Sequence, residues 1–151
     1  MRKFAAKIMA LLACGALSTM LAGSALAEEW PLAEGDYWSV TGIYVKDGGD
    51  LKYATYLTGE WRKNQEFAKS KGWIKSYMVL ANVSPRSGEP SLYLITTFES
   101  VVSGAEDEKR AKEYDAWSKK TNELLQTESG NRAQFREVKS NLLLQEMKFR
   151  N

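Results

Sequence analysis

The sequence predicts an α+β domain in which four antiparallel strands form one sheet and two helices cover one of its faces. Segments rich in β-branched and aromatic residues alternate with two helical segments in the order β-α-β-β-α-β. Only a short loop with two prolines and a glycine separates the two middle strand segments, which indicates an antiparallel pair. Apolar residues occur on both sides of the strands, which indicates a sheet that is covered on both faces.

The first strand is predicted over residues 37–45, where β-branched and aromatic residues are dense, and it ends before two glycines. The first helix is predicted over residues 51–71. Its apolar residues recur at three- and four-residue steps, at Ala54, Leu57, Trp61 and Ala68. Gly72 follows, and glycine readily adopts the left-handed conformation that ends a helix.

The next two strands are predicted over residues 73–83 and 91–99, on either side of the loop with the two prolines. Neither strand has a polar side. In the first of them Tyr77 and Val79 lie on one side while Met78 lies on the other. A sheet made from such strands needs a cover on both of its faces.

The second helix is predicted over residues 105–129, with acidic residues in its first turns and a glycine just after its end. Its apolar stripe is narrow and consists of Tyr114, Trp117, Thr121 and Leu124. Glu106 and Arg110 are four residues apart and are expected to form an ion pair on the solvent side. The last strand is predicted over residues 135–149.

Residues 1–27 are typical of a secretory signal, with a basic start, an uncharged middle and the small-residue exit Ala-Leu-Ala. Cleavage near Ala27 predicts a periplasmic or secreted protein whose single domain comprises residues 28–151. The alternative is a lipoprotein acylated at Cys14, because the residues around this cysteine loosely resemble a lipobox.

Residues 28–151 contain neither histidine nor cysteine. The usual zinc sites, His-dependent triads, Cys nucleophiles and His-ligated haem need one of these side chains, so we expect no metal and no cofactor. Removal of residues 1–27 takes away three basic residues and no acidic ones, which changes the formal charge from +2 to −1. We therefore expect no nucleic-acid partner, and we expect no membrane span in the mature chain.

The predicted element order is that of the ferredoxin-like fold, whose two helices leave one sheet face open. With strands that are apolar on both sides, the chain resembles the dimeric α/β-barrel superfamily, in which two such protomers press their open faces together. Two stretches resemble an exported branch of unknown function, related in fold to stress-response A/B-barrel and antibiotic-biosynthesis-monooxygenase-type domains: "GEWRKNQEFAKSKGWIKSYMVL" and "GEPSLYLITTFES". The resemblance implies a homodimer and a pocket between the sheet and the helices. Haem degraders of this fold need a His ligand, so that activity is not expected.

Four residues are candidates for contact with a small apolar or aromatic ligand: Tyr44, Trp61, Asn64 and Tyr93. The competing interpretation is structural, because an aromatic residue at helical spacing usually packs in the core and a strand tyrosine usually satisfies its hydroxyl locally. Trp73 and Tyr77 are candidates for the dimer interface, where tryptophan and tyrosine are common anchors, and pocket lining is their alternative role. No catalytic residue is assigned.

The sequence thus predicts an exported homodimer that holds a small apolar or aromatic molecule without catalysis. The first alternative is a cofactor-independent monooxygenase or isomerase, since such enzymes of this superfamily hold their substrate with Asn, Trp and Tyr side chains. The second alternative is a structural dimer that binds a partner through its helices. A ligand-binding domain or an enzyme needs a cavity of the order of a few hundred Å³, whereas a structural dimer has this space filled.

Overall fold

The computed structural model describes residues 29–150. The signal predicted for residues 1–27 and the lipid attachment considered at Cys14 lie outside this part of the chain. The elements are β1 (Leu32–Val45), α1 (Asp50–Tyr56), the π-helical turn η1 (Leu57–Trp61), α2 (Arg62–Ser70), β2 (Ser76–Ala81), β3 (Leu92–Phe98), α3 (Gly104–Ser118), α4 (Asn122–Arg132) and β4 (Arg136–Phe149).

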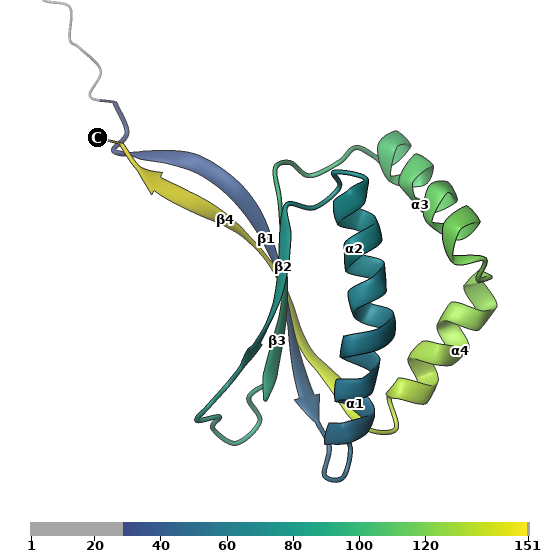
Figure 1. Cartoon of the computed structure of the whole chain (residues 1–151). Coiled ribbons are helices and arrows are strands. Elements are labelled where there is room, and N and C mark those ends of the chain that lie inside the picture. Colours follow the sequence, from purple (N-terminus) through teal and green to yellow (C-terminus); the bar gives the residue numbers. More distant parts are fainter. Residues whose placement is uncertain (1–28, 151) are drawn as a thin grey trace, which may run out of the picture.

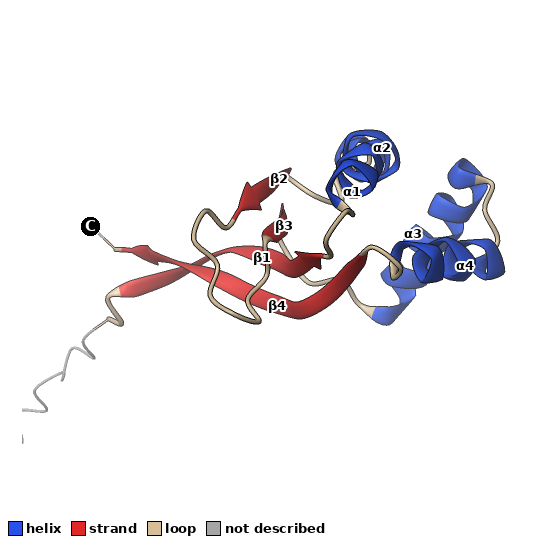
Figure 2. Ribbon diagram, turned by 90° about the horizontal axis from the view of Figure 1, so that it is seen from below, coloured by secondary structure: helices blue, strands red, loops and turns tan. Residues whose placement is uncertain are grey.

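The four strands form one antiparallel sheet in the order β2-β3-β1-β4. This is the ferredoxin-like order, and it confirms the predicted α+β class. The helices lie on one side of the sheet, which Figure 1 shows nearly edge-on. β1 and β4 continue past the other strands as a two-stranded ribbon, in which Leu32 pairs with Phe149 (Figure 2).

The first strand is longer than predicted, because it begins at Leu32 and not at Tyr37. The additional residues pair with β4, and a bulge between Glu34 and Tyr37 absorbs the change of register. An acidic segment with a glycine carries little strand signal of its own, so the pairing partner determines its conformation.

Residues 50–70 form one continuous helix, in which η1 is a π-helical turn that contains Gly59. The side of this helix that faces the sheet carries most of the core. Its buried residues Tyr53, Leu57 and Trp61 form a cluster with Ile43 of β1. This helix therefore anchors the helical layer to the sheet, as its apolar spacing predicts.

The helix ends at Gly72, which has a φ of 70° and so confirms the predicted left-handed terminator. The N–H group of Trp73 then donates a hydrogen bond of 2.9 Å to the carbonyl oxygen of Ala68. Trp73 thus belongs to the helix end, and the strand predicted over residues 73–83 is shorter, beginning at Ser76.

The prediction of a single helix over residues 105–129 is wrong, because the chain is interrupted in the middle of this segment and forms the two helices α3 and α4. Lys119 has a φ of 55°, in the left-handed region, and ends α3. Thr121 begins α4 as its N-cap, since its hydroxyl oxygen accepts a hydrogen bond of 3.2 Å from the N–H group of Leu124. These two features interrupt the helical hydrogen bonds, and the chain bends there (Figure 1).

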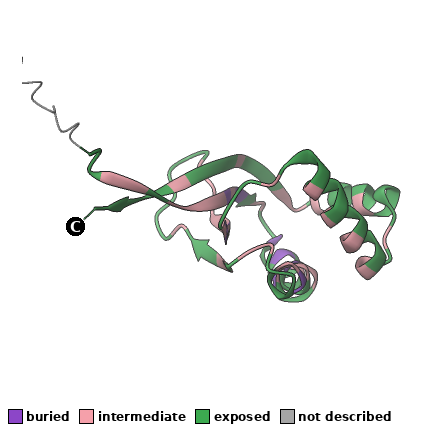
Figure 3. Cartoon of the chain, turned by 90° about the horizontal axis from the view of Figure 1, so that it is seen from above, coloured by how far each residue is buried: buried purple, intermediate pink, exposed green. Residues whose placement is uncertain are grey.

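Neither α3 nor α4 contains a buried residue, as Figure 3 shows. Their attachment runs through side chains of the first helix. The ring of Phe67 stacks on that of Trp117 with a centroid distance of 4.2 Å. The ammonium group of Lys120 lies 2.8 Å from the Glu60 carboxylate of η1 and 2.7 Å from the Glu128 carboxylate of α4.

Within residues 29–150, no helix has the length and apolar character that a membrane crossing requires.

The strands are apolar on both sides, as predicted. The face turned away from the helices is termed the open face and carries Trp38, Val40, Met78, Leu80, Tyr93, Ile95, Leu142 and Leu144. Val40 and Ile95 are buried at its centre, whereas Leu142 and Leu144 of β4 are 47% and 50% exposed. No helix of the described chain lies over this face (Figure 1). β4 is also uncovered on its helix side, where Leu143 is 57% exposed.

Candidate functional site

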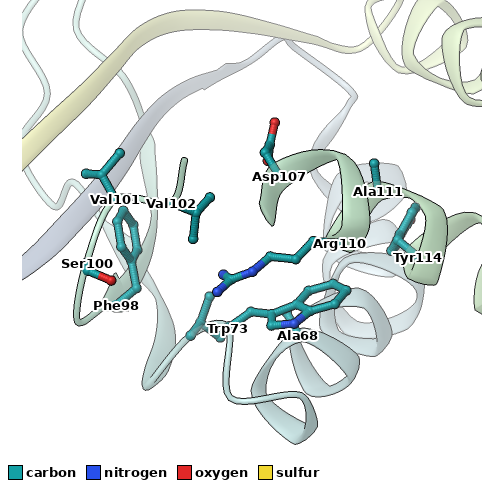
Figure 4. Close-up of a pocket in the computed structure, with 11 residues that line it drawn as sticks. Ala68, Trp73, Phe98, Ser100, Val101, Val102, Asp107, Arg110, Ala111 and Tyr114 are labelled. Atoms are coloured by element: carbon teal, nitrogen blue, oxygen red, sulfur yellow. The ribbon is translucent and has the colours of Figure 1, made fainter. Parts of the chain in front are cut away.

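A cavity of about 430 Å³ lies between the end of α2, the segment before β2, the segment after β3 and the first turns of α3. It is termed the α2–α3 cavity. Its lining is largely apolar or aromatic and consists of Ala68, Trp73, Ile74, Phe98, Ser100, Val101, Val102, Asp107, Arg110, Ala111 and Tyr114 (Figure 4). Its size is that of a site for a small organic ligand.

Trp73 forms an aromatic wall of this cavity. Its ring meets the buried ring of Phe67 edge-on, at a centroid distance of 5.3 Å and an interplanar angle of 90°. Because its backbone N–H group is also bound to the end of α2, the position of the indole is fixed from two sides. A wall fixed in this way is available to a ligand without a large cost in side-chain entropy.

Arg110 supplies the positive charge of the cavity and reaches from α3 toward Trp73 (Figure 4). Its guanidinium carbon lies 5.6 Å from the centre of the Trp73 ring. Its Nε atom donates a hydrogen bond of 2.9 Å to Glu106, which holds the pKa of that carboxyl below its usual range and confirms the predicted pair. Its Nη atoms make no hydrogen bond within residues 29–150, so they can meet an acceptor group of a ligand.

Tyr114 and Asp107 are the other titratable groups that line the cavity. Burial raises the pKa of Tyr114, so its hydroxyl keeps its proton at neutral pH and serves as a hydrogen-bonding group. Asp107 lies in the first turn of α3 and is exposed to solvent. The arrangement suits the holding of an apolar body with one polar group more than it suits proton transfer.

Two of the residues singled out by the sequence contact each other between helix and sheet. Trp61 is buried, and its ring meets that of Tyr77 edge-on at a centroid distance of 5.4 Å. The Tyr77 hydroxyl donates a hydrogen bond to the Glu66 carboxylate, and this bond raises the pKa of Tyr77. The ligand contact predicted for Trp61 and the dimer contact predicted for Tyr77 stay predictions.

Asn64 lines a second cavity of about 360 Å³, between η1, the start of α2 and the break between α3 and α4. Its lining also includes Gly59, Glu60, Lys63, Trp117, Ser118 and Lys120. Trp61 is not part of this lining. The structure therefore separates Asn64 and Trp61, which the sequence had placed together at one candidate site.

Tyr44 and Tyr93 project from the open face, away from the helices. Tyr44 is exposed, and the ammonium group of Lys139 lies 5.2 Å from the centre of its ring. The four predicted ligand contacts thus lie in three different places, and none of them lines the α2–α3 cavity. Trp73, which was predicted for the dimer interface, does line it.

The sequence reasoning missed Arg110, Phe98 and Val102 as cavity residues. Arg110 was interpreted only as the partner of Glu106. The spacing of Arg110 and Tyr114, four residues apart, places both on one side of a helix and could have indicated a shared environment. No local pattern brings Phe98 and Val102 to them, because that contact depends on how α3 lies against α2.

Within the described part of the chain, no group of three or more His, Cys, Asp or Glu side chains is placed to hold a metal ion. Comparison of the chain with protein-family models, with curated proteins and with solved structures finds no significant match. The functional argument therefore depends on the geometry of the chain itself.

Proposed function

We propose that the chain is an exported homodimeric domain that holds a small apolar or aromatic molecule in the α2–α3 cavity without converting it. The cavity carries this proposal, since a volume of about 430 Å³ and a largely apolar lining suit a small organic ligand. The Nη atoms of Arg110 favour a ligand that also bears an acceptor group, such as a carboxylate.

Binding is favoured over catalysis by the titratable groups of the cavity. A general acid or base works best with a pKa near neutrality, whereas burial moves the pKa of Tyr114 upward and away from it. A cofactor-independent monooxygenase or isomerase of the dimeric α/β-barrel type is the second proposal, and it is supported by the strand order and by the aromatic wall of Trp73. A purely structural dimer does not account for the α2–α3 cavity.

Filling the cavity tests the proposal. Ala111→Trp places an indole in the lining on α3, and Ala116→Trp on the same helix, outside the lining, is the matched control. With indole and benzoate as probes, ligand-detected NMR is expected to show binding to the unmodified protein and to Ala116→Trp, and none to Ala111→Trp. Equal signals from the two variants, or no binding by the unmodified protein, contradict the proposal.

A second copy of the chain is proposed to cover the open face. Leu142 and Leu144 stand half exposed on it, and burial of such apolar surface contributes roughly 25 cal/mol per Å². A twofold axis through the sheet pairs the same patch on both copies and leaves the helices of both copies outermost. This is the arrangement that the resemblance to the dimeric α/β-barrel superfamily implies.

Two neighbouring leucines on opposite sides of β4 provide a test with a built-in control. Leu144→Glu puts a charge on the open face, and Leu143→Glu puts the same charge on the helix side at similar exposure. Sedimentation velocity of residues 28–151 is expected to show dimers of the unmodified protein and of Leu143→Glu, and monomers of Leu144→Glu. Identical behaviour of the two variants, or a monomeric unmodified protein, contradicts the dimer.

A further inference from the structure

Two arginines lie at the corner of the molecule where α4 ends and β4 begins. Arg132 is the last residue of α4 and Arg136 is the first residue of β4. Arg136 pairs with Val45 on the helix side of the sheet. The chain between the arginines passes close to the lower end of α1, where the ring of Phe135 lies 6.4 Å from that of Tyr53 (Figure 1).

Neither arginine has a carboxylate partner within residues 29–150. The acidic residues nearest to them in sequence are occupied by lysines, since Glu128 binds Lys120 at 2.7 Å and Glu137 binds Lys139 at 2.6 Å. The Nε atoms of Arg132 and Arg136 are buried and make no hydrogen bond to the described residues. A buried donor left without an acceptor costs about 1–3 kcal/mol, so each of these atoms calls for a partner.

Two tyrosines of α1 lie next to the arginines. The guanidinium carbon of Arg132 lies 4.5 Å from the centre of the Tyr56 ring, and the rings of Tyr56 and Tyr53 are 5.7 Å apart. Burial raises the pKa of Tyr53 to about 12 and also raises that of Tyr56, while the charges of both arginines act in the opposite direction on each. Both hydroxyls are therefore protonated at neutral pH and lie within electrostatic reach of both cations.

We propose that Arg132 and Arg136 form a binding site for a small oxyanion, a carboxylate or phosphate group, with the hydroxyls of Tyr53 and Tyr56 as further donors. Guanidinium groups bind carboxylate and phosphate through paired N–H donors, and stacking on Tyr56 orients the first of them. A bound oxyanion offsets positive charge of the two guanidinium groups, which have no carboxylate partner within residues 29–150.

This site is independent of the α2–α3 cavity. Tyr53 and Ala68 lie toward opposite ends of the same helix, roughly 20 Å apart at a rise of about 1.5 Å per residue. Failure of the proposed cavity function therefore leaves this proposal standing, and the reverse also holds.

The test observes the arginines directly. The Nε–H signals of Arg132 and Arg136 are followed by NMR in the unmodified protein during titration with sodium phosphate and with sodium acetate. Sodium chloride at matched ionic strength is the control. We expect saturable shifts of both signals with at least one of the two oxyanions and not with chloride. A response to acetate alone indicates a carboxylate ligand, and a response to phosphate alone indicates a phosphate ligand.

Variants identify the binding residues. Arg132→Gln and Arg136→Gln are each expected to weaken oxyanion binding by about tenfold or more, whereas Arg86→Gln in the exposed hairpin loop leaves it unchanged. Tyr53→Phe is expected to weaken binding by a smaller factor. Circular dichroism establishes that each variant is folded, and the titration of the unmodified protein decides the question if one is not. The absence of saturable shifts with both oxyanions, or equal binding by Arg132→Gln, overturns the proposal.

Discussion

The helices form two layers that are attached in different ways. The first layer, α1–η1–α2, packs on the sheet, and the second layer, α3 and α4, packs on the first. The continuous helix α1–η1–α2 buries Tyr53, Leu57, Trp61 and Phe67, whereas α3 and α4 bury no residue (Figure 3). Both layers carry aromatic side chains, but only the first layer carries them on a stripe wide enough to cover strands. The second layer instead rests on the first through the stack of Phe67 on Trp117.

We therefore expect the first layer to carry most of the stability and the second layer to open and move more easily. A segment with few buried apolar contacts opens locally at a lower free energy than the core does. α3 forms one side of the α2–α3 cavity, and the end of α2, where Phe67 is buried, forms another. If the proposed ligand binds in the α2–α3 cavity, we therefore expect it to displace α3 and to leave the core of the first helix intact.

The largest expected effect comes from making the same substitution, leucine to alanine, in both layers and comparing the losses in the free energy of unfolding. Leu57→Ala in η1 removes a buried side chain and is expected to lower the free energy of unfolding by about 3 kcal/mol. Leu124→Ala in α4 removes one that is 44% exposed, and a change of about 0.5 kcal/mol or less is expected. Urea denaturation measures both, and equal losses are incompatible with the contrast drawn between the layers.

The next effect comes from the ring contact that joins the layers. Trp117→Ala removes the stack on Phe67 and is expected to cost about 2 kcal/mol. Amide hydrogen exchange is expected to accelerate in α3 and to change little in α1. Trp30→Ala, at a tryptophan that is 68% exposed, is the control and leaves both rates unchanged. Faster exchange in α1 alone is the result that refutes the assignment.

High pH tests how firmly α1 is buried. The pKa of Tyr53 is about 12 in the folded chain against 10.0 for an exposed tyrosine, so the unfolded state releases this proton first. The contribution of Tyr53 to the free energy of unfolding is therefore fully present below pH 10. It is lost as the pH rises toward 12, by about 1 kcal/mol per pH unit after allowance for solvent screening. Denaturation across this range measures the slope, and Tyr53→Phe is expected to reduce it. An unchanged slope in this variant assigns the alkaline loss to other groups.

The smallest effect separates the layers by helix propensity. Gly59 in η1 and Gly130 in α4 both have open space where a β-carbon would be placed. Gly59→Ala is expected to add about 0.5–1 kcal/mol to the free energy of unfolding, because η1 belongs to the cooperative core. Gly130→Ala is expected to add less, because α4 opens before the core does. Thermal denaturation compares the two variants, and a larger gain at Gly130 reverses the ranking of the layers.

The class and order of the elements were predictable from the sequence because they depend on local patterns. The spacing of Leu57 and Trp61 predicts a helix, and Gly72 predicts its end. The break in the second helix was missed although Thr121 is a good N-cap residue, because the apolar stripe continues across it from Trp117 to Leu124. A continued stripe signals one helix, whereas the left-handed conformation of Lys119 has no comparable signature in its residue type.

The candidate site was less predictable, because it is made from contacts between distant segments. The sequence singled out Trp61 and Trp73 by residue type alone, and that information does not distinguish a core ring from a cavity wall. Arg110 has an evident ion-pair partner one turn away in Glu106. The sequence pattern predicts this pair but not the position of Arg110 beside Trp73. The unsatisfied Nε atoms at the α4–β4 corner also become visible only when the chain is folded.

β4 is an edge strand of the sheet, and along its 14 residues the outward main-chain groups have no strand beside them. An edge strand of this kind can pair with a strand from another molecule. Charged residues stand near both ends of it, at Lys139 beside a bulge and at Lys148, while the run Leu142 to Leu144 between them is uncharged and β-prone. Concentrated preparations are therefore expected to associate through this edge, because the ion pairs of Lys139 with Glu137 and of Lys148 with Glu146 leave little net charge beside the run to oppose it.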